Sequence, residues 1–302
     1  MSLTRARALA WGVATLRRRR IDTPRLDAEV LLAHTLGCER VALYRDAQDP
    51  LTAPVLARFQ ELVHRRAAHE PLAYLIQSRE FWSLPLTVRA GVLIPRPETE
   101  FVVEAALHYA KPCIRQAGRC RILDVGTGSG NIAIAVASDL GQAVIVATDL
   151  SAEALAIAQA NARACGVADR ITFLQCDLIG ALNPRKARFD LLLSNPPYIA
   201  TRECASLPKT IRCYEPRMAF DGGDDGLLFY RRLIAEAAQF LHNGSAAIVE
   251  VGDRQAGAVC RLFKQSARWT CVDVIKDYAG VERVVVAQCT QGGAKLHGSD
   301  RG

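Results

Sequence analysis

From residue 121 onward, short apolar segments that fit β-strands alternate with longer segments that fit helices. The expected helices span residues 130–139, 152–165 and 226–240. Such alternation is typical of α/β domains, in which helices cover both faces of a mostly parallel sheet. The sequence therefore predicts an α/β fold with a doubly wound, Rossmann-like sheet. Its expected strands span residues 121–125, 144–149, 171–175, 190–194, 246–251, 270–276 and 281–288.

Residues 1–80 have a different pattern, which predicts a small helical domain. Leu26, Val30 and Leu31 recur at helical spacing, and Gly37 is a typical residue after a helix end. A second helix is expected after Pro54. The remaining segments are a β-hairpin linker at 81–95, the α/β domain at 96–290, which opens with a helix at 98–110, and a glycine-rich disordered tail at 291–302.

Composition narrows the class of protein. Half of the 302 residues are hydrophobic, so the chain can form a sizeable core, but no apolar run is long enough to cross a bilayer. The start of the chain lacks the ordered zones of a signal peptide. Ten cysteines are scattered without C-x-x-C spacing, which favours reduced thiols over disulfides or a metal site. We therefore expect a cytoplasmic protein without a membrane or metal partner.

The net charge of +7 permits a polyanionic partner but does not demand one. The densest basic cluster is Arg17–Arg20. Basic side chains near a helix C-terminus complement the helix dipole, so the cluster is interpreted as a solvated helix end. A direct nucleic-acid contact is not required to explain it.

A glycine-rich loop follows the first expected strand and opens a helix. Its glycines let the backbone turn tightly and approach a ligand closely. The G-x-G-x-G spacing differs from the G-x-G-x-x-G of dinucleotide folds, and Asp124 stands just before it. A carboxylate there would repel a pyrophosphate but suits the cationic amino group of S-adenosyl-L-methionine, which is the expected cofactor. The predicted cofactor residues of this loop are Asp124, Gly126, Thr127, Gly128, Ser129 and Gly130.

Acidic residues also end the next two expected strands. Asp149 lies 19 residues after Gly130, where a carboxylate accepts hydrogen bonds from ribose hydroxyls in nucleotide folds. Asp177 and Leu178 follow the third strand. We expect Asp177 to accept the exocyclic amine of the adenine and Leu178 to pack on the ring.

The motif Asn195-Pro196-Pro197-Tyr198 follows the fourth expected strand, at the same sheet edge as the glycine loop. An amide or aromatic amine nitrogen is a poor nucleophile, so an enzyme must orient it and stabilise the positive charge that develops on it. The Asn195 side-chain oxygen and the Pro196 carbonyl can each accept one N–H of an –NH2 group, and Tyr198 can stack on its flat face. The motif, with Asn195 also bordering the cofactor, predicts a methyltransferase acting on a planar nitrogen.

The motif alone leaves the substrate open. A protein glutamine amide and the N6 amine of adenine present the same –NH2 geometry. The chain shows no DNA-recognition domain or basic-aromatic insert, which disfavours a nucleic-acid substrate. A non-enzymatic protein that kept the fold is disfavoured because Asn195 and the glycine loop are intact.

Further segments resemble the HemK/PrmC family, the N5-glutamine methyltransferases of peptide chain release factors. The resemblance covers nearly the whole chain. It includes residues 24–29 (PRLDAE), 94–100 (IPRPETE), 214–216 (YEP) and 250–252 (EVG). Related ribosomal-protein glutamine methyltransferases usually differ at the position of residues 94–100.

This resemblance implies a class I methyltransferase fold whose helical domain recognises the substrate. The implied substrate is the glutamine of the Gly-Gly-Gln motif in class 1 release factors, held by Asn195, Pro196, Pro197 and Tyr198. Leu178 departs from the family pattern, because members often carry an aromatic residue there, and residues 278–283 differ slightly from the usual form. We expect a monomer with a release factor as its protein partner.

Overall fold

The computed structural model describes residues 3–290, which form two compact units. The helical unit contains the chain up to Ser78 together with Val88–Ala90 and Leu207–Glu215, and the α/β unit contains the rest. Two stretches of the helical unit therefore lie beyond the boundary expected at residue 80, because chain that is distant in sequence packs with this unit. The tail expected at 291–302 lies outside the described residues.

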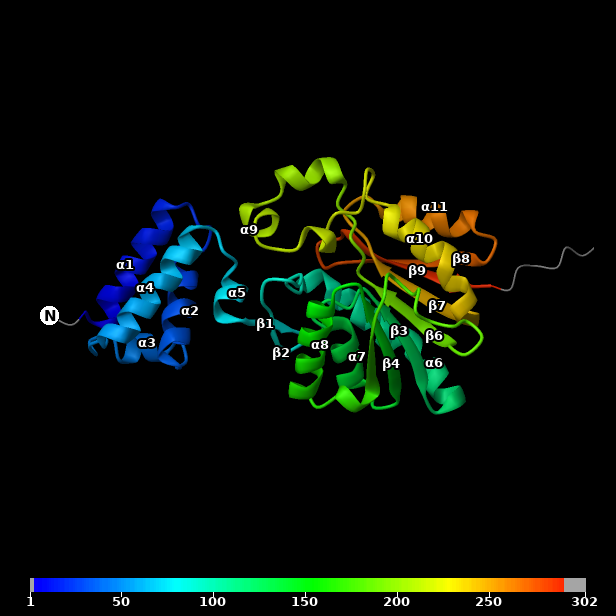
Figure 1. Ribbon diagram of the computed structural model, residues 1–302, viewed down its shortest axis with the longest axis horizontal. Coiled ribbons are helices and arrows are strands. Elements are labelled where there is room, and N and C mark those ends of the chain that lie inside the picture. The colour runs from blue at the N-terminus through cyan, green and yellow to red at the C-terminus, as the bar shows by residue number, and fades with distance from the viewer. Residues whose placement is uncertain (1–2, 291–302) are drawn as a thin grey trace, which may run out of the picture. The chain divides into compact units, whose positions relative to one another are not determined.

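The helical unit is built on α1 (Arg5–Arg18), α2 (Pro24–Leu36) and α4 (Ala53–Ala67), which pack on one another (Figure 1). Pro24 occupies the first turn of α2, where its missing N–H has no helical partner to lose. Gly37 ends α2 with a φ of 63°, as expected. The short helices α3 (Ala42–Arg45), α5 (Leu72–Ile76) and α9 (Lys209–Arg212) complete the unit, and Arg17–Arg20 are exposed at the end of α1.

An ion pair between Asp27 and Arg66 joins α2 to α4. Arg66 Nε lies 2.7 Å from Asp27 Oδ2, and the Asp27 side chain is buried. Replacing Arg66 with alanine leaves a buried carboxylate without its charged partner, so we expect a loss on the order of 2 kcal/mol from the free energy of unfolding of the helical unit. Denaturant unfolding of the full chain measures it. Arg58→Ala, on the same helix but in an exposed pair with Glu61, should cost under about 1 kcal/mol; equal effects would contradict this account.

The α/β unit confirms the predicted doubly wound sheet. Within residues 3–290 its seven strands have the order β5-β4-β3-β6-β7-β9-β8, with β3 to β7 parallel and β9 antiparallel to both neighbours. All expected strands are present, although β7 begins five residues early. Their bounds are β3 (Cys120–Val125), β4 (Ala143–Asp149), β5 (Ile171–Gln175), β6 (Phe189–Ser194), β7 (Leu241–Glu250), β8 (Trp269–Lys276) and β9 (Glu282–Cys289).

Two apolar clusters cover the two faces of this sheet. Because side chains alternate along a strand, Leu191 and Leu193 of β6 join one cluster and Leu192 joins the other. The first cluster includes α6 (Glu100–Ala117), α7 (Asn131–Asp139) and α8 (Ala152–Ala164). The second includes α10 (Leu228–Ala237) and α11 (Ala256–Gln265), which lie together in Figure 1. The carboxyl ends of the parallel strands thus share one edge.

Several boundaries differ from the expected ones. The hairpin of β1 (Ser78–Phe81) and β2 (Leu84–Thr87) begins earlier, and Trp82 and Ser83 form its turn with positive φ. The turn η1 (Pro97–Thr99) precedes α6, which continues past Pro112 to Ala117. Helix α10 starts only at Leu228 and is followed by η5 (Ala238–Phe240). The described residues include no helix long and apolar enough to span a membrane.

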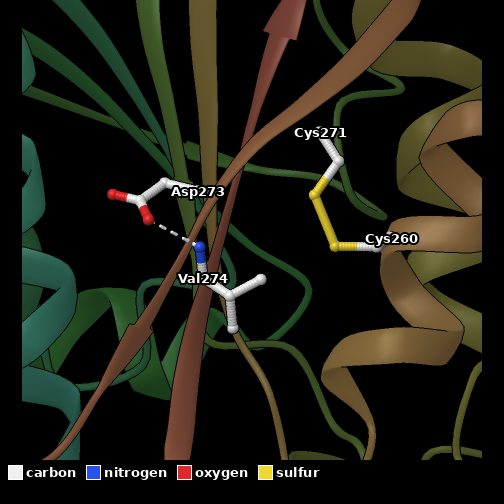
Figure 2. The surroundings of a disulfide bond; sticks show 4 residues. All are labelled: Cys260, Cys271, Asp273 and Val274. Carbon is white, nitrogen blue, oxygen red and sulfur yellow. Dashed lines mark hydrogen bonds between the residues drawn. A yellow bond between two sulfur atoms is a disulfide. The ribbon is translucent and has the colours of Figure 1, made fainter.

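The prediction that all cysteines are reduced is wrong for one pair. Cys260 on α11 and Cys271 on β8 form a disulfide (Figure 2). Packing of α11 on β8 brings the two Cα atoms to 5.7 Å, within the usual range for such a bond. Sequence spacing could not reveal this pair, because the contact depends on how a helix lies on a neighbouring strand. The other eight cysteines are free.

Candidate active site

A cavity of about 210 Å³ lies at the carboxyl ends of β3, β4, β5 and β6. It brings together most of the residues predicted from the sequence, although they come from four separate strand ends. Residues that the sequence did not single out, including Val92, Leu93, Met218 and Phe229, also line it. The predicted residues that line it are Gly126, Gly128, Asp149, Asp177, Leu178, Asn195, Pro196 and Pro197.

The glycine loop has the conformation that its sequence predicts. Gly126 and Gly128 have φ values of 74° and 56°, and a Cβ added to either would point into open space. Side chains there would occupy room that a ligand needs. Gly130 has another role: it caps α7 with a φ of 85°, and a Cβ would come within 2.9 Å of Ile134 and 3.1 Å of Ala158. The loop backbone is therefore open to a ligand at Gly126 and Gly128, whereas Gly130 is tightly packed and fixes the end of the loop.

Asp149 fixes the loop from the end of β4. Its Oδ2 accepts a hydrogen bond from the Gly128 N–H at 2.8 Å, and its Oδ1 accepts one from the Ser151 N–H at 2.9 Å. Burial raises the pKa of this carboxyl, and the backbone donors oppose that rise. Each oxygen keeps a further lone pair for a ligand hydroxyl. Asp149 therefore fits the predicted ribose-binding role.

Asp124 lies beneath the loop and is fully buried. Thr127 Oγ1 donates to its Oδ2 at 2.6 Å, whereas its Oδ1 has no hydrogen-bond partner among the described residues. Burial, and then the charge of Asp149, raise the pKa of Asp124 to about 7. Because Asp124 is fully buried, its predicted contact with the cationic amino group of the cofactor stays a prediction. Thr127 and Ser129 are also buried and, like Asp124 and Gly130, do not line the cavity.

The raised pKa of Asp124 predicts a pH dependence of stability. Between its ordinary value of 3.8 and about 7, the folded protein keeps a proton that the unfolded chain releases, so the free energy of unfolding should fall as pH rises through this window. Denaturant unfolding of ligand-free protein at several pH values measures this slope. Asp124→Asn should make the slope shallower; an unchanged slope would show that Asp124 is already ionised in the folded state.

Asp177 and Leu178 border the cavity beyond β5. Asp177 Oδ2 accepts from Arg232 Nη2 at 2.7 Å, which leaves Oδ1 for a ligand amine. Leu178 has a φ of 50° and also lines the cavity. Their predicted contacts with adenine are compatible with these positions and stay predictions.

The Asn195–Tyr198 motif divides between the cavity and the interior. Asn195, Pro196 and Pro197 line the cavity, and Asn195 Nδ2 donates to Thr99 Oγ1 at 3.0 Å. Tyr198 does not line it. Its hydroxyl donates to Glu250 Oε1 at 3.3 Å, so the structure gives no support to stacking of Tyr198 on a substrate group.

Three glycines leave room for this motif. A Cβ on Gly222 would lie 2.8 Å from the Pro197 carbonyl oxygen, and one on Gly252 would lie 2.9 Å from the Tyr198 ring. A Cβ on Gly226 would meet the Tyr198 carbonyl oxygen, which also accepts from Gln255 Nε2 at 2.9 Å. Backbone atoms and a half-buried, packed ring cannot move aside easily, so these glycines hold the motif in one place.

Thr99 and Glu250 were not among the site residues predicted from the sequence. The available signal was their place in residues 94–100 and 250–252, which were noted only for their resemblance to a family. Thr99 ends η1 and Glu250 ends β7, so the fold places both beside the motif.

Comparison with known proteins decides the family. Residues 7–76 match the PrmC N-terminal domain, and residues 122–215 match a methyltransferase domain. The chain is 40% identical to the release factor glutamine methyltransferase of Rhodopirellula baltica, over 93% of this chain and 95% of that one. The corresponding protein of Moorella thermoacetica is 41% identical, over 94% and 98%.

The chain belongs to the release factor glutamine methyltransferase family. It is a methyltransferase, and S-adenosyl-L-methionine is its methyl donor. Among solved structures, a methyltransferase from Pyrococcus furiosus has a TM-score of 0.51 and 15% identity, and the match covers 77% of this chain and 98% of that one. That likeness confirms the class I methyltransferase fold.

Proposed function

We propose that this enzyme methylates the side-chain amide nitrogen, N5, of the glutamine in the Gly-Gly-Gln motif of class 1 peptide chain release factors. The observation that supports it most is the shared cavity of Asn195, Pro196 and the glycine loop. A cofactor held by the loop and an amide held by the motif would meet there. The curated relatives are named for the same reaction.

The chemistry needs acceptors more than a base. When bound, the cofactor would supply an electrophilic sulfonium methyl group, whose S–CH3 bond breaks as the N–C bond forms, and would leave as the neutral thioether S-adenosyl-L-homocysteine. Because Asn195 Nδ2 is engaged by Thr99, the Asn195 Oδ1 remains to accept one N–H of the substrate amide, and the Pro196 carbonyl accepts the other. Both oxygens stabilise the positive charge that develops on nitrogen during transfer. The proton can leave to water after the new N–C bond has formed.

Mass spectrometry of a release factor tests the proposal. The purified enzyme and S-adenosyl-L-methionine should add the mass of one methylene group to the peptide with the Gly-Gly-Gln motif, because N–CH3 replaces N–H. A release factor with that glutamine replaced by alanine is the matched control. Methylation that persists on the control would overturn the proposal. Methylation of DNA or RNA adenine, or of a ribosomal-protein glutamine, would identify one of the alternative substrates.

The same proposal includes where the enzyme acts, its oligomeric state and its partners. We expect the enzyme to act in the cytoplasm as a monomer and to need no nucleic acid. The helical unit is the expected recognition surface for the release factor. Sedimentation of the enzyme alone, and methylation assays with nuclease-treated components, test these expectations.

A further inference from the structure

The Asn195 side chain is the first member of a buried hydrogen-bonded chain. Asn195 Nδ2 donates to Thr99 Oγ1 at 3.0 Å, and Thr99 Oγ1 donates to Glu250 Oε2 at 2.6 Å. Thr99 and Glu250 are each 1% exposed. Neither lines the cavity. Both therefore act on a substrate only through another group.

We propose that Thr99 and Glu250 are positioning residues that fix which way the Asn195 amide faces. The proposal rests on the proposed function only in that Asn195 Oδ1 must accept an N–H from the methylated group. If the amide were reversed, its NH2 would face the substrate N–H and repel it.

The direction of each hydrogen bond in the chain follows from which groups can donate and which can only accept. An ionised carboxylate only accepts hydrogen bonds, so Thr99 must give its single hydroxyl proton to Glu250. The Thr99 oxygen can then only accept from Asn195, and the group facing it must be the NH2. Asn195 Oδ1 is left toward the cavity. The charge of Glu250 thus determines the polarity of every bond in the chain.

Other groups around Glu250 support this polarity. The Tyr198 hydroxyl donates to Oε1 at 3.3 Å, and the Tyr230 hydroxyl donates to the Glu250 backbone carbonyl at 2.7 Å. Burial raises the pKa of Glu250 to about 7, the hydrogen bonds from Thr99 and Tyr198 oppose this, and the nearby charges of Glu98 and Arg283 act in opposite directions. Protonation of Glu250 would let Thr99 accept from it and donate to Asn195 Oδ1, which reverses the amide.

Thr99 offers a matched pair of variants. Thr99→Val keeps the shape but removes the hydroxyl, and Thr99→Ser keeps the hydroxyl. We expect kcat to fall roughly 10-fold in Thr99→Val, the loss of one oriented hydrogen bond, and to recover to within about threefold in Thr99→Ser. The KM for S-adenosyl-L-methionine should change little. In an Asn195→Ala background, Thr99→Val should cause no further loss, because its only route of action has been removed.

Glu250→Gln gives a second readout. In the wild type, kcat at saturating substrates should fall below about pH 7 as Glu250 is protonated, since the folded-state pKa is raised to about that value. Glu250→Gln should be slow at all pH values and lack this acidic limb. Thermal unfolding of each variant shows whether it is folded; if Thr99→Val is unfolded, the pH profile of Glu250→Gln carries the test, and if Glu250→Gln is unfolded, the comparison of Thr99→Val with Thr99→Ser carries it.

Failure of the positioning role and failure of the proposed glutamine substrate would give different results in these experiments. Full activity in Thr99→Val, equal losses in Thr99→Val and Thr99→Ser, or an unchanged acidic limb in Glu250→Gln would overturn the positioning role. Each variant is assayed with the acceptor that the wild type methylates, whether glutamine or adenine. A wild type that methylates only adenine overturns the glutamine substrate and leaves the positioning test intact.

Discussion

Replacing Asn195 with alanine should lower kcat by about 100- to 1,000-fold, which is the usual effect of removing one preorganised group that stabilises transition-state charge. The variant loses the side-chain oxygen that accepts the substrate N–H, while the Pro196 carbonyl, a backbone group, stays in place. Binding of S-adenosyl-L-methionine should change much less, because the glycine loop and Asp149 are intact. Single-turnover kinetics and calorimetric titration of the cofactor measure the two effects separately.

Asn183→Ala is the control for this experiment. Asn183 is exposed, lies outside the cavity and is of the same residue type. It should leave both turnover and cofactor affinity unchanged. If Asn195→Ala weakens cofactor binding as much as it slows turnover, Asn195 is chiefly a cofactor ligand.

Replacing Asp149 with alanine should weaken binding of S-adenosyl-L-methionine by about 100-fold, equivalent to losing two hydrogen bonds to a charged acceptor. Asp149 is the expected partner of the ribose hydroxyls. Its loss also frees the N–H groups of Gly128 and Ser151, so the loop becomes less ordered. At saturating cofactor, kcat should fall by a much smaller factor. Calorimetric titration with S-adenosyl-L-homocysteine checks the affinity.

Asp169→Ala removes an exposed acid from the short turn η2 (Ala168–Arg170) that precedes β5, and it serves as the control. It should bind the cofactor as the wild type does. Unchanged affinity in Asp149→Ala would show that the ribose is held elsewhere.

The sequence predicted those parts of the fold that depend on local pattern. Buried parallel strands are short and continuously apolar, so the strands were found within a few residues. The ends of elements were less predictable. Pro112 suggests an early helix end, yet α6 continues to Ala117 because its apolar side packs on the sheet. Tertiary packing outweighed local preference there.

In the candidate site, too, some residues could be predicted from local sequence pattern and others depend on tertiary packing. The cavity-lining glycines, Asp149 and Asn195 stand next to strand ends, so chain order and sheet edge were enough to group them. Thr99 and Glu250 are 151 residues apart and meet only because η1 and the end of β7 lie beside the motif. The disulfide between Cys260 and Cys271 likewise depends on the placement of a helix on a strand. Such pairs leave no pattern in the spacing of residues.

The helical unit takes in Leu207–Glu215, a stretch that begins soon after Tyr198. Within that unit, the Tyr214 hydroxyl donates to the Ala68 carbonyl at 2.8 Å. A shortened protein that started at Arg79 would strip this stretch of its packing partners, although its own sequence would be intact. A chimaera that exchanged only residues 3–78 with those of another methyltransferase would pair a foreign helical bundle with the original 207–215 segment. Moving the whole helical unit between such enzymes therefore requires two coordinated grafts, one on each side of the Asn195–Tyr198 motif.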